Sequence, residues 1–396
     1  MRVVWVTPQQ PGPAGGGGSN HEFELLKALS TRHEIDVITS YKDADVAGLD
    51  VGLTVVPFEV HAPPATRFET AWAVTRARQP LVAWILRERI PALSAEMRRR
   101  KGVDLTHVML GEIAPVLAAV DGPSSLLLFD SYARHSDALL AIERIPRRRI
   151  RWRLERLQAR GFERRWYKLA TALACVTPDD ARPLERSLRR PVDVIPNPIA
   201  EDFFAAPAVQ RSRSLVLFVG GVGYPPNTEA LRWWMSEIWP RIVSRRPEAR
   251  FLAVGRGAEA PEAVELLRPL VGEHRMVLDV PDVRPYYWEA AVTVAPVRLG
   301  AGLRNKVIHA FATGSPVVST STAAQGTGAL HGEHLLLADD AERFADAVVD
   351  VLEDPATASV RASRARTLVA DLNASRIVDM VERWWERALQ ARRVMT

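Results

Sequence analysis

The segment with the most chemistry is VAPVRLGAGLRNKVIHAFATGSPVVST, about three quarters of the way along the chain. It places Gly300 and Gly302 before Arg304 and Lys306, where a predicted strand passes into a predicted helix. Glycines let the backbone approach a ligand closely, and a helix beginning near Leu303 points free N–H groups into the same loop. The segment predicts an anion site whose natural occupant is a diphosphate. The alternative is a tight turn with solvated cations.

A second glycine-rich loop lies near the N-terminus. Gly15 to Gly18 are four consecutive glycines before a predicted helix, and Ser19 with Glu22 has the spacing of a capping box. The bare backbone at Gly17 and Gly18 predicts another ligand-facing loop, against the alternative of a merely flexible one. The loop does not fit the G-x-G-x-x-G dinucleotide fingerprint, because no acidic residue ends the next strand, EIDVITS.

Other polar residues give weaker signals. His135 lies in FDSYARHSD, just after a predicted strand end, and could reach a ligand there, although a lone histidine is often structural. Asp43 and Asp45 form a D-x-D pair in a polar loop. No H-E-x-x-H, G-x-S-x-G or P-loop lysine motif occurs. We therefore expect no metal site.

These loops belong to two α/β halves with the same order of elements. VVWVT, the glycine loop, a helix and EIDVITS form a βαβ unit, which implies a parallel sheet. The order restarts at SLVLFVGG (214–221), where Gly221 opens a loop and Asn227 or Thr228 is expected to cap the next helix. Ligands bind outside the carboxyl ends of the strands in open α/β sheets. Two such edges predict an interdomain cleft.

The strand pattern also predicts the domain boundaries. VDVIPNPI is the last strand of the first half, and residues 201–214 have the composition of a linker. We expect a first domain over 1–197 and a second over 198–374. The segment 375–396 is predicted to be a helix whose apolar stripe, which includes Trp384, packs back on the first domain.

Composition excludes several classes of protein. The chain has 52 Lys+Arg against 47 Asp+Glu, with 47% hydrophobic and 25% charged residues, which excludes disorder, collagen and coiled coil. The single Cys175 excludes an internal disulfide framework and a thiolate metal cluster. No apolar run approaches the roughly 20 residues that span a bilayer, and the N-terminus begins directly in a strand pattern. We expect a cytoplasmic protein.

Positive charge is concentrated between residues 144 and 165, which contain ten arginines and only two acids. Ile150, Leu154 and Leu157 recur at spacings of four and three and predict a helix with one apolar stripe. The arginines fit either a solvated helix face or an anionic partner, such as a phosphorylated substrate or the lipid headgroups at the inner membrane face. Nucleic acid ranks last, because no recognisable nucleic-acid module surrounds the segment.

Several blocks together resemble a known family. GAGLRNKVIHAFATGSPVVST is similar to the G-x-G-x-x-x-K-x-x-E-A-x-A-x-G-x-P-V-V pattern of retaining GT-B glycosyltransferases of family four, also called glycosyl transferases group 1. VIPNPI resembles the interdomain V-I-P-N-G-V strand. LVLFVGGVGYPPNTEALRWW, FLAVGRG and VPDVRPYYWEAAVTVAPVRLG, which contains Val283, resemble further second-half blocks. In the first half, SNHEFELLKAL, the FDS strand end with Asp130, and FERR before CVT complete the resemblance.

The resemblance implies an α/β protein with the GT-B fold, in which two Rossmann-like domains face each other across a cleft. It implies sugar transfer from a nucleoside-diphosphate sugar, bound by the second domain, to an acceptor in the first, with retention at the anomeric carbon. No cofactor and no metal are expected, because basic residues and a helix N-terminus take up the diphosphate charge. The sequence does not identify the acceptor, and three classes stay open: a surface glycan, a lipid-linked sugar and a natural-product small molecule. The residues implied are Asp130 and His135 for catalysis, and Gly17, Gly18, Gly221, Val283, Gly300, Gly302, Leu303, Arg304, Lys306 and His309 for the donor.

Two positions depart from the family pattern. The family usually carries glutamates where this chain has Ala301 and His309; the first faces the donor sugar and the second binds the ribose hydroxyls. A neutral imidazole has one acceptor nitrogen, so His309 can still bind one hydroxyl. Repulsion from Arg304 and Lys306 is expected to favour that neutral form. Two other functions therefore stay open: a nucleotide-sugar-binding protein without transferase activity, and a sugar-nucleotide epimerase.

Overall fold

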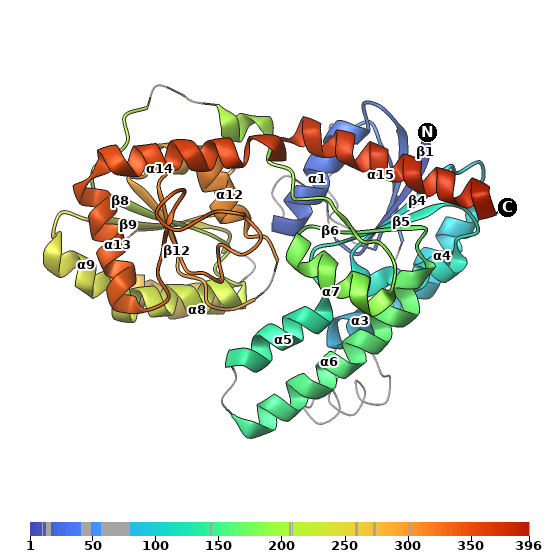
Figure 1. Ribbon diagram of the computed structural model, residues 1–396, viewed down its shortest axis with the longest axis horizontal. Helices are drawn as coiled ribbons and strands as arrows, with labels where there is room; N and C mark the ends of the chain where they lie inside the picture. The colour runs from blue at the N-terminus through green and yellow to red at the C-terminus, as the bar shows by residue number, and fades with distance from the viewer. Residues whose placement is uncertain are drawn as a thin grey trace. The chain divides into compact units, whose positions relative to one another are not determined.

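The computed structural model describes residues 1–9, 11–12, 17–40, 49–56, 80–142, 145–205, 207, 209–257, 260–271, 275–300 and 302–395. The chain forms two compact units. Unit 1 comprises Met1–Pro198 with Ala374–Thr396, and unit 2 comprises Ile199–Asn373 (Figure 1). The sequence placed these divisions at 197/198 and 374/375. None of the helices in the described ranges is long and apolar enough to cross a membrane.

Unit 1 is built on a seven-stranded sheet in the order β3-β2-β1-β4-β5-β6-β7, and all its paired strands are parallel. Its central strands are buried along nearly their whole length, as expected inside a parallel sheet, and they include the polar residues His107, Ser124 and Ser125. The strands are β1 (Arg2–Thr7), β2 (Glu34–Thr39), β3 (Gly52–Val55), β4 (Leu105–Met109), β5 (Ser124–Leu128), β6 (Ala172–Cys175) and β7 (Asp193–Val194).

The helices of unit 1 include the C-terminal helix α15 (Ala374–Met395), as the apolar stripe around Trp384 predicts. Trp384 and Trp385 are fully buried, and α15 packs on α1, β5 and β6. The ring of Trp385 lies 5.4 Å from His107 of β4 and 6.3 Å from Trp5 of β1. The other helices are α1 (Gly17–Leu29), α3 (Leu81–Leu86), α4 (Arg89–Arg99), η1 (Gly111–Ala119), α5 (Tyr132–Ile142), α6 (Pro146–Trp166), η2 (Tyr167–Leu169) and α7 (Pro178–Leu188).

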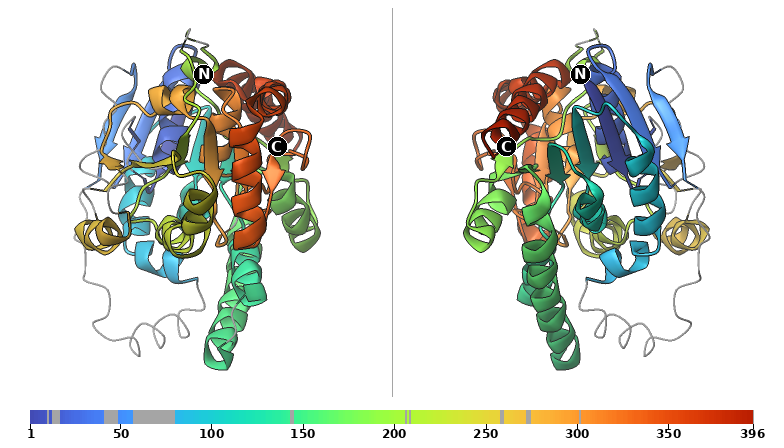
Figure 2. Two further views of the ribbon diagram at one scale, coloured as in Figure 1. Left: turned by 90° about the vertical axis from the view of Figure 1, so that its left-hand side faces the viewer. Right: turned by 90° about the vertical axis from the view of Figure 1, so that its right-hand side faces the viewer.

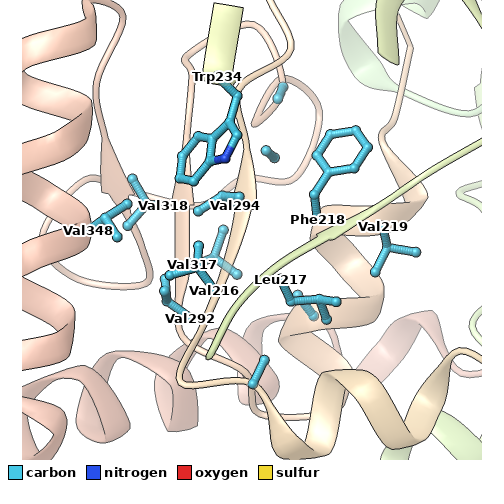
Figure 3. Packing of buried hydrophobic residues seen from close by; sticks show 14 of the residues in the cluster. Val216, Leu217, Phe218, Val219, Trp234, Val292, Val294, Val317, Val318 and Val348 are labelled. Carbon is cyan, nitrogen blue, oxygen red and sulfur yellow. The ribbon is translucent and has the colours of Figure 1, made fainter. Parts of the chain in front are cut away.

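Unit 2 has a second parallel sheet, with six strands in the order β10-β9-β8-β11-β12-β13. Figure 3 shows valines of β8, β11 and β12 packed with Trp234 and Val348 in its core. The strands are β8 (Leu215–Val219), β9 (Arg250–Gly255), β10 (Arg275–Leu278), β11 (Val292–Ala295), β12 (Val317–Ser319) and β13 (Leu336–Leu337). The helices are η3 (Glu201–Phe204), α8 (Pro225–Trp233), η4 (Trp234–Ile238), α9 (Trp239–Arg245), α10 (Pro261–Val271), α11 (Arg284–Glu289), α12 (Asn305–Ala312), α13 (Ala341–Glu353), α14 (Pro355–Leu368) and η5 (Ala370–Leu372).

Both sheets reverse their strand order beside their first strand. In unit 1 the reversal lies between β1 and β4, and in unit 2 between β8 and β11. Crossover connections leave such a pair of strands in opposite directions, so the loops at their carboxyl ends diverge and leave room for a ligand. The glycine loops follow β1, β8 and β11. The sequence therefore puts its glycines where the topology favours binding.

Three local expectations are wrong. Residues 201–214 are not a free linker, because Phe203 is buried and Arg211 donates to the carbonyls of Tyr287 and Thr313 within unit 2. Helix α8 begins at Pro225, so neither Asn227 nor Thr228 is its N-cap. The third wrong expectation is the capping box of Ser19 and Glu22.

Ser19 and Glu22 do not form the expected cap because helix α1 already begins at Gly17. The carboxylate of Glu22 instead accepts hydrogen bonds from Trp5 Nε1 at 2.5 Å and Thr7 Oγ1 at 2.9 Å. Burial raises the pKa of Glu22 to about 7. This side chain therefore ties α1 to β1 rather than closing the helix end.

Candidate functional site

The switch point of unit 2 is tightly packed around glycines. A Cβ on Gly255, at the end of β9, would lie 2.1 Å from the carbonyl oxygen of Gly220. A Cβ on Gly220 would lie 2.7 Å from the Asn227 amide nitrogen and 2.8 Å from Lys306 Nζ. Gly221 is different, since its nearest neighbour would be the Arg256 carbonyl at 3.7 Å. Gly220 and Gly255 are thus needed for packing, whereas Gly221 leaves room beside its Cα.

Lys306 brings a cation to this loop. Its Nζ donates to Asn227 Oδ1 at 2.7 Å and lies 4.0 Å from the centre of the Phe218 ring. Burial, and secondarily the charge of Arg304, lowers the pKa of Lys306 well below its ordinary value. Because the site disfavours an uncompensated ammonium, a bound anion would restore the charge. The ammonium is thus held in place, and it forms no ion pair with any residue in the described ranges.

Arg304 stands at the N-cap of α12 and covers the glycine loop. Its Nη2 donates to the Leu299 carbonyl at 3.1 Å, and a Cβ on Gly300 would lie 2.4 Å from the same nitrogen. Gly300 and Gly302 have φ values of +104° and +82°, which only glycine adopts readily. Arg304 Nε is buried and bonds to none of the residues that the structure describes. The guanidinium of Arg304 thus lies over the glycine loop, with its Nε donor not used by the described residues.

His309 lies one turn further along α12 and stacks on Phe203. The two ring centres are 4.1 Å apart with an interplanar angle of 30°. Burial lowers the pKa of His309 to about 4. The low pKa agrees with the expected neutral imidazole, but its cause is burial of the ring and not repulsion from Arg304 and Lys306.

Val283 and Leu303 play packing parts in the structure. Val283 is the N-cap residue of α11, and both side chains lie against the core of unit 2. Beside Val283, the carboxylate of Asp282 accepts from Arg284 at 2.8 and 2.9 Å. Any contact of these two residues with a ligand stays a prediction.

The expected residues of unit 1 lie at two places. Gly17 and Gly18 begin α1 at the switch point, where a Cβ on Gly18 would lie 2.7 Å from the Phe129 ring. Asp130 follows β5, and His135 lies in the first turn of α5; both are half-buried. The structure thus places this pair at the carboxyl edge of β5, one strand beyond the switch point. Four residues named above lie outside the described ranges: Gly15, Asp43, Asp45 and Ala301.

Sequence reasoning missed a group of buried acids at the same edge. Glu112 follows β4, two residues after Leu110, whose φ of 72° is unusual for a residue with a side chain. Burial raises the pKa of Glu112 to about 7, while a hydrogen bond with Tyr132 acts against this. The signal in the sequence was an acid one residue beyond the segment LTHVML, at the reversal of strand order.

Glu163 of α6 is the second missed acid. It is 1% exposed, and its Oε1 accepts from Ser131 Oγ at 2.8 Å and from the Ala133 amide at 3.2 Å. These bonds tie α6 to the start of α5, next to Asp130. Burial raises the pKa of Glu163 to about 7.

We expect Glu163→Gln to change the pH dependence of stability. Between the unfolded pKa of 4.5 and the folded value of about 7, the folded wild type binds one proton more than the unfolded chain. Its free energy of unfolding therefore falls as pH rises through this window, by up to about 1.4 kcal/mol per pH unit. The variant lacks this loss. Its free energy of unfolding relative to that of wild type should therefore rise from pH 5 to 7 and become constant above pH 8. Urea unfolding at each pH measures the difference, and a constant difference would contradict the buried protonated carboxyl.

Comparisons with known proteins agree with this architecture. Residues 213–354 match the family described as Glycosyl transferases group 1. An uncharacterized 44.6 kDa protein in the cps region of Klebsiella pneumoniae is 27% identical over 140 residues, which are 34% of this chain and 36% of that protein. The chain thus spans about a third of the length of this curated relative.

Solved structures match over nearly the whole chain. Sucrose-phosphate synthase from Thermosynechococcus elongatus has a TM-score of 0.74 and 18% identity, covering 99% of this chain and 100% of that one. α,α-Trehalose-phosphate synthase from Burkholderia xenovorans, in complex with glucose-6-phosphate, has a TM-score of 0.70 and 14% identity. The match covers 98% of this chain and 100% of that one. HepE of Anabaena, in complex with UDP-glucose, has a TM-score of 0.64 and 13% identity. The match covers 97% of this chain and 98% of that one. Residues 213–354 therefore match the glycosyl transferases group 1 family, and the chain as a whole has the GT-B fold.

Proposed function

We propose that the protein is a retaining glycosyltransferase that uses a nucleoside-diphosphate sugar. The observation that carries the proposal is Lys306 Nζ, held by Asn227 at 2.7 Å beside the glycine loop at the switch point of unit 2. This site lies within the residues that match the family. HepE, a structural neighbour, has been solved with UDP and with UDP-glucose, which supports a nucleotide sugar as co-substrate here.

The diphosphate of the donor would lie against the N-terminus of α12. Lys306, Arg304 and the free N–H groups of the helix would neutralise it as it leaves. In the reaction, the bond between C1 and the phosphate oxygen breaks, and the acceptor oxygen bonds to C1 on the same face. The acceptor proton passes to the leaving phosphate. Asp130 and His135 are proposed to contact the reacting groups from unit 1.

The acceptor proposed is a surface glycan, a lipid-linked sugar or a natural-product small molecule. Use of a nucleotide sugar and the single buried thiol, Cys175, fit a cytoplasmic location. The proposal also includes peripheral contact of α6 with an anionic membrane.

We expect turnover to survive chelation, because Lys306, Arg304 and a helix terminus supply the positive charge that a metal would otherwise provide. Nucleoside diphosphate release should be the same with and without EDTA. Complete loss of release in EDTA, restored by Mg²⁺ or Mn²⁺, would contradict this mechanism.

We expect His309→Ala to weaken nucleoside diphosphate binding by about twofold to tenfold, the range of one neutral hydrogen bond to ribose. His309→Glu should retain affinity, because a carboxylate accepts from both ribose hydroxyls. With a pKa of about 4, the wild-type imidazole stays neutral from pH 5.5 to 8, so its contribution should not change there. Calorimetric titrations of both variants test this, and wild-type affinity in each would place His309 outside the ribose site.

Donor hydrolysis tests the proposed reaction without a known acceptor, since water can replace the acceptor slowly. The protein is incubated with α-linked UDP, GDP and dTDP sugars, and proton NMR follows the first anomer released. A retaining transferase releases the α sugar together with nucleoside diphosphate. Release of the β sugar would contradict retention.

The same NMR experiment separates the two alternatives. A nucleotide-sugar-binding protein without activity, which the sequence departure at Ala301 favours, would broaden donor signals and release nothing. An epimerase would return a sugar with an inverted ring carbon.

A further inference from the structure

Helix α6 carries an apolar stripe that none of the described residues of unit 1 covers. Ile150, Leu154 and Leu157 fall on one helical face, and they are 58%, 48% and 60% exposed. The opposite face is occupied, because Ala159 and Phe162 are buried within unit 1. The sequence predicted this stripe, and the structure shows that it is the outward face of the helix.

Arginines border the stripe on both sides. By helical spacing, Arg147 and Arg151 lie along one edge, and Arg153 lies along the other. All three are exposed, and they form no ion pair with any residue in the ranges that the structure describes. The two acids of α6 do not lie beside the stripe: Glu155 is half-buried and accepts from the Leu81 amide at 2.8 Å, and Glu163 is buried.

Helices α5 and α6 form a hairpin in unit 1. Figures 1 and 2 show α5 and α6 side by side, projecting from the sheet of unit 1. Arg156 bonds Asp137 of α5 at 2.9 Å, and Arg149 donates to the Leu140 carbonyl at 2.9 Å. These contacts hold the hairpin together on its inner side and leave the stripe on its outer side.

We propose that this face of α6 docks the protein on a membrane surface rich in anionic lipid. The three aliphatic side chains would enter the boundary between headgroups and acyl chains, and the bordering arginines would pair with lipid phosphates. Arginine stems can lie along the apolar boundary while their guanidinium groups stay at headgroup level. A helix with cations on both sides of an apolar stripe has the charge complement of such a surface.

Other occupants fit the face less well. A second copy of the chain would bring its own arginine borders against these arginines, with no exposed acid on α6 to pair with them. Nucleic acid favours aromatic side chains that stack on bases, but the centre of this face is aliphatic, and Phe162 is buried.

Vesicle flotation tests the proposal with the full chain. The vesicles contain either phosphatidylcholine alone or equal parts phosphatidylcholine and phosphatidylglycerol. Wild type should float only with the anionic vesicles and be released by high salt. The variant Ile150→Ser/Leu154→Ser/Leu157→Ser should bind at least tenfold more weakly, and Arg147→Gln/Arg151→Gln/Arg153→Gln about a hundredfold.

Matched controls separate position from composition. Leu330→Ser/Val360→Ser removes residues of unit 2 that are 58% and 53% exposed, and Arg232→Gln/Arg250→Gln/Arg364→Gln removes three exposed charges there. Both controls should bind like wild type. Equal binding by the α6 variants, or equal loss in the controls, would overturn the proposal.

An environment-sensitive dye locates the contact. Cys175 is buried, so a dye attached to Leu157→Cys reports on α6 alone. Its emission should shift to the blue with anionic vesicles, and the same dye on Leu330→Cys should not shift. A blue shift that needs a second copy of the chain or added RNA instead of vesicles would assign the face to that partner and overturn lipid docking. Vesicle binding needs no nucleotide sugar, so this result is independent of the proposed transferase.

Discussion

Replacing Lys306 by alanine is expected to weaken the binding of a nucleoside diphosphate by tenfold to a hundredfold. The variant loses a charge-assisted contact, worth roughly 1.5–3 kcal/mol. The loss should be large because the ammonium is held in place by Asn227 at 2.7 Å and above the Phe218 ring at 4.0 Å, so little ordering remains to be done on binding. Calorimetric titration with UDP, GDP and dTDP measures the effect.

A second substitution separates charge from packing at this position. Lys306→Met keeps the length of the side chain over Phe218 but removes the ammonium, so it should lose affinity as Lys306→Ala does while unfolding like wild type. Removal of the positioning amide in Asn227→Ala should cost less affinity than either. Unchanged nucleotide affinity in both Lys306 variants would show that the phosphates bind elsewhere.

Gly255→Ala is expected to abolish measurable nucleotide binding and to lower the free energy of unfolding by about 1–3 kcal/mol, the range for overpacking. The new Cβ would lie 2.1 Å from the Gly220 carbonyl oxygen and 3.1 Å from the Gly221 nitrogen, all of them backbone atoms. The loop after β8 must therefore move. Urea unfolding and calorimetric titration of the same sample report both effects.

Gly221→Ala is the matched control. Its Cβ would meet nothing closer than the Arg256 carbonyl at 3.7 Å, so its stability should equal that of wild type. If the donor approaches the Gly221 backbone, Gly221→Ala should lose nucleotide affinity without losing stability. Full affinity in Gly255→Ala would contradict the assignment of the β8 loop to the binding site.

The two-part architecture could be predicted from the sequence because its signals are local. Each half begins with a buried β-branched strand followed by glycines and a helix, and the wide stripe with Trp384 has to pack on a core. The glycine loop at Gly300 and Gly302 could also be predicted from the local sequence. Their positive φ values are a property of the loop itself.

The missed features depend on contacts between distant residues. Asn227 was interpreted as a helix cap, but its side chain binds Lys306, which lies 79 positions away. His309 stacks on Phe203, in a segment that had the composition of a linker. The residues next to Asn227 and His309 in the sequence do not indicate these partners.

Glu22 and Glu163 show the same limit. A capping spacing is a local pattern, whereas a carboxyl buried under Trp5 or Ser131 is a tertiary arrangement. Burial decides the protonation of these acids, and burial follows from the packed fold rather than from neighbours in the chain.

The central claim is that Lys306 contacts the diphosphate of a nucleotide sugar, and lysine NMR tests it most directly. The chain has five lysines, so protein labelled with carbon-13 at lysine Cε gives five signals, and Lys306→Met identifies one of them. Free Lys306 should titrate below its ordinary pKa because it is buried. With one of UDP, GDP or dTDP, in EDTA, the Lys306 signal alone should shift and its pKa should rise. A Lys306 signal that none of the three nucleotides moves would contradict the account.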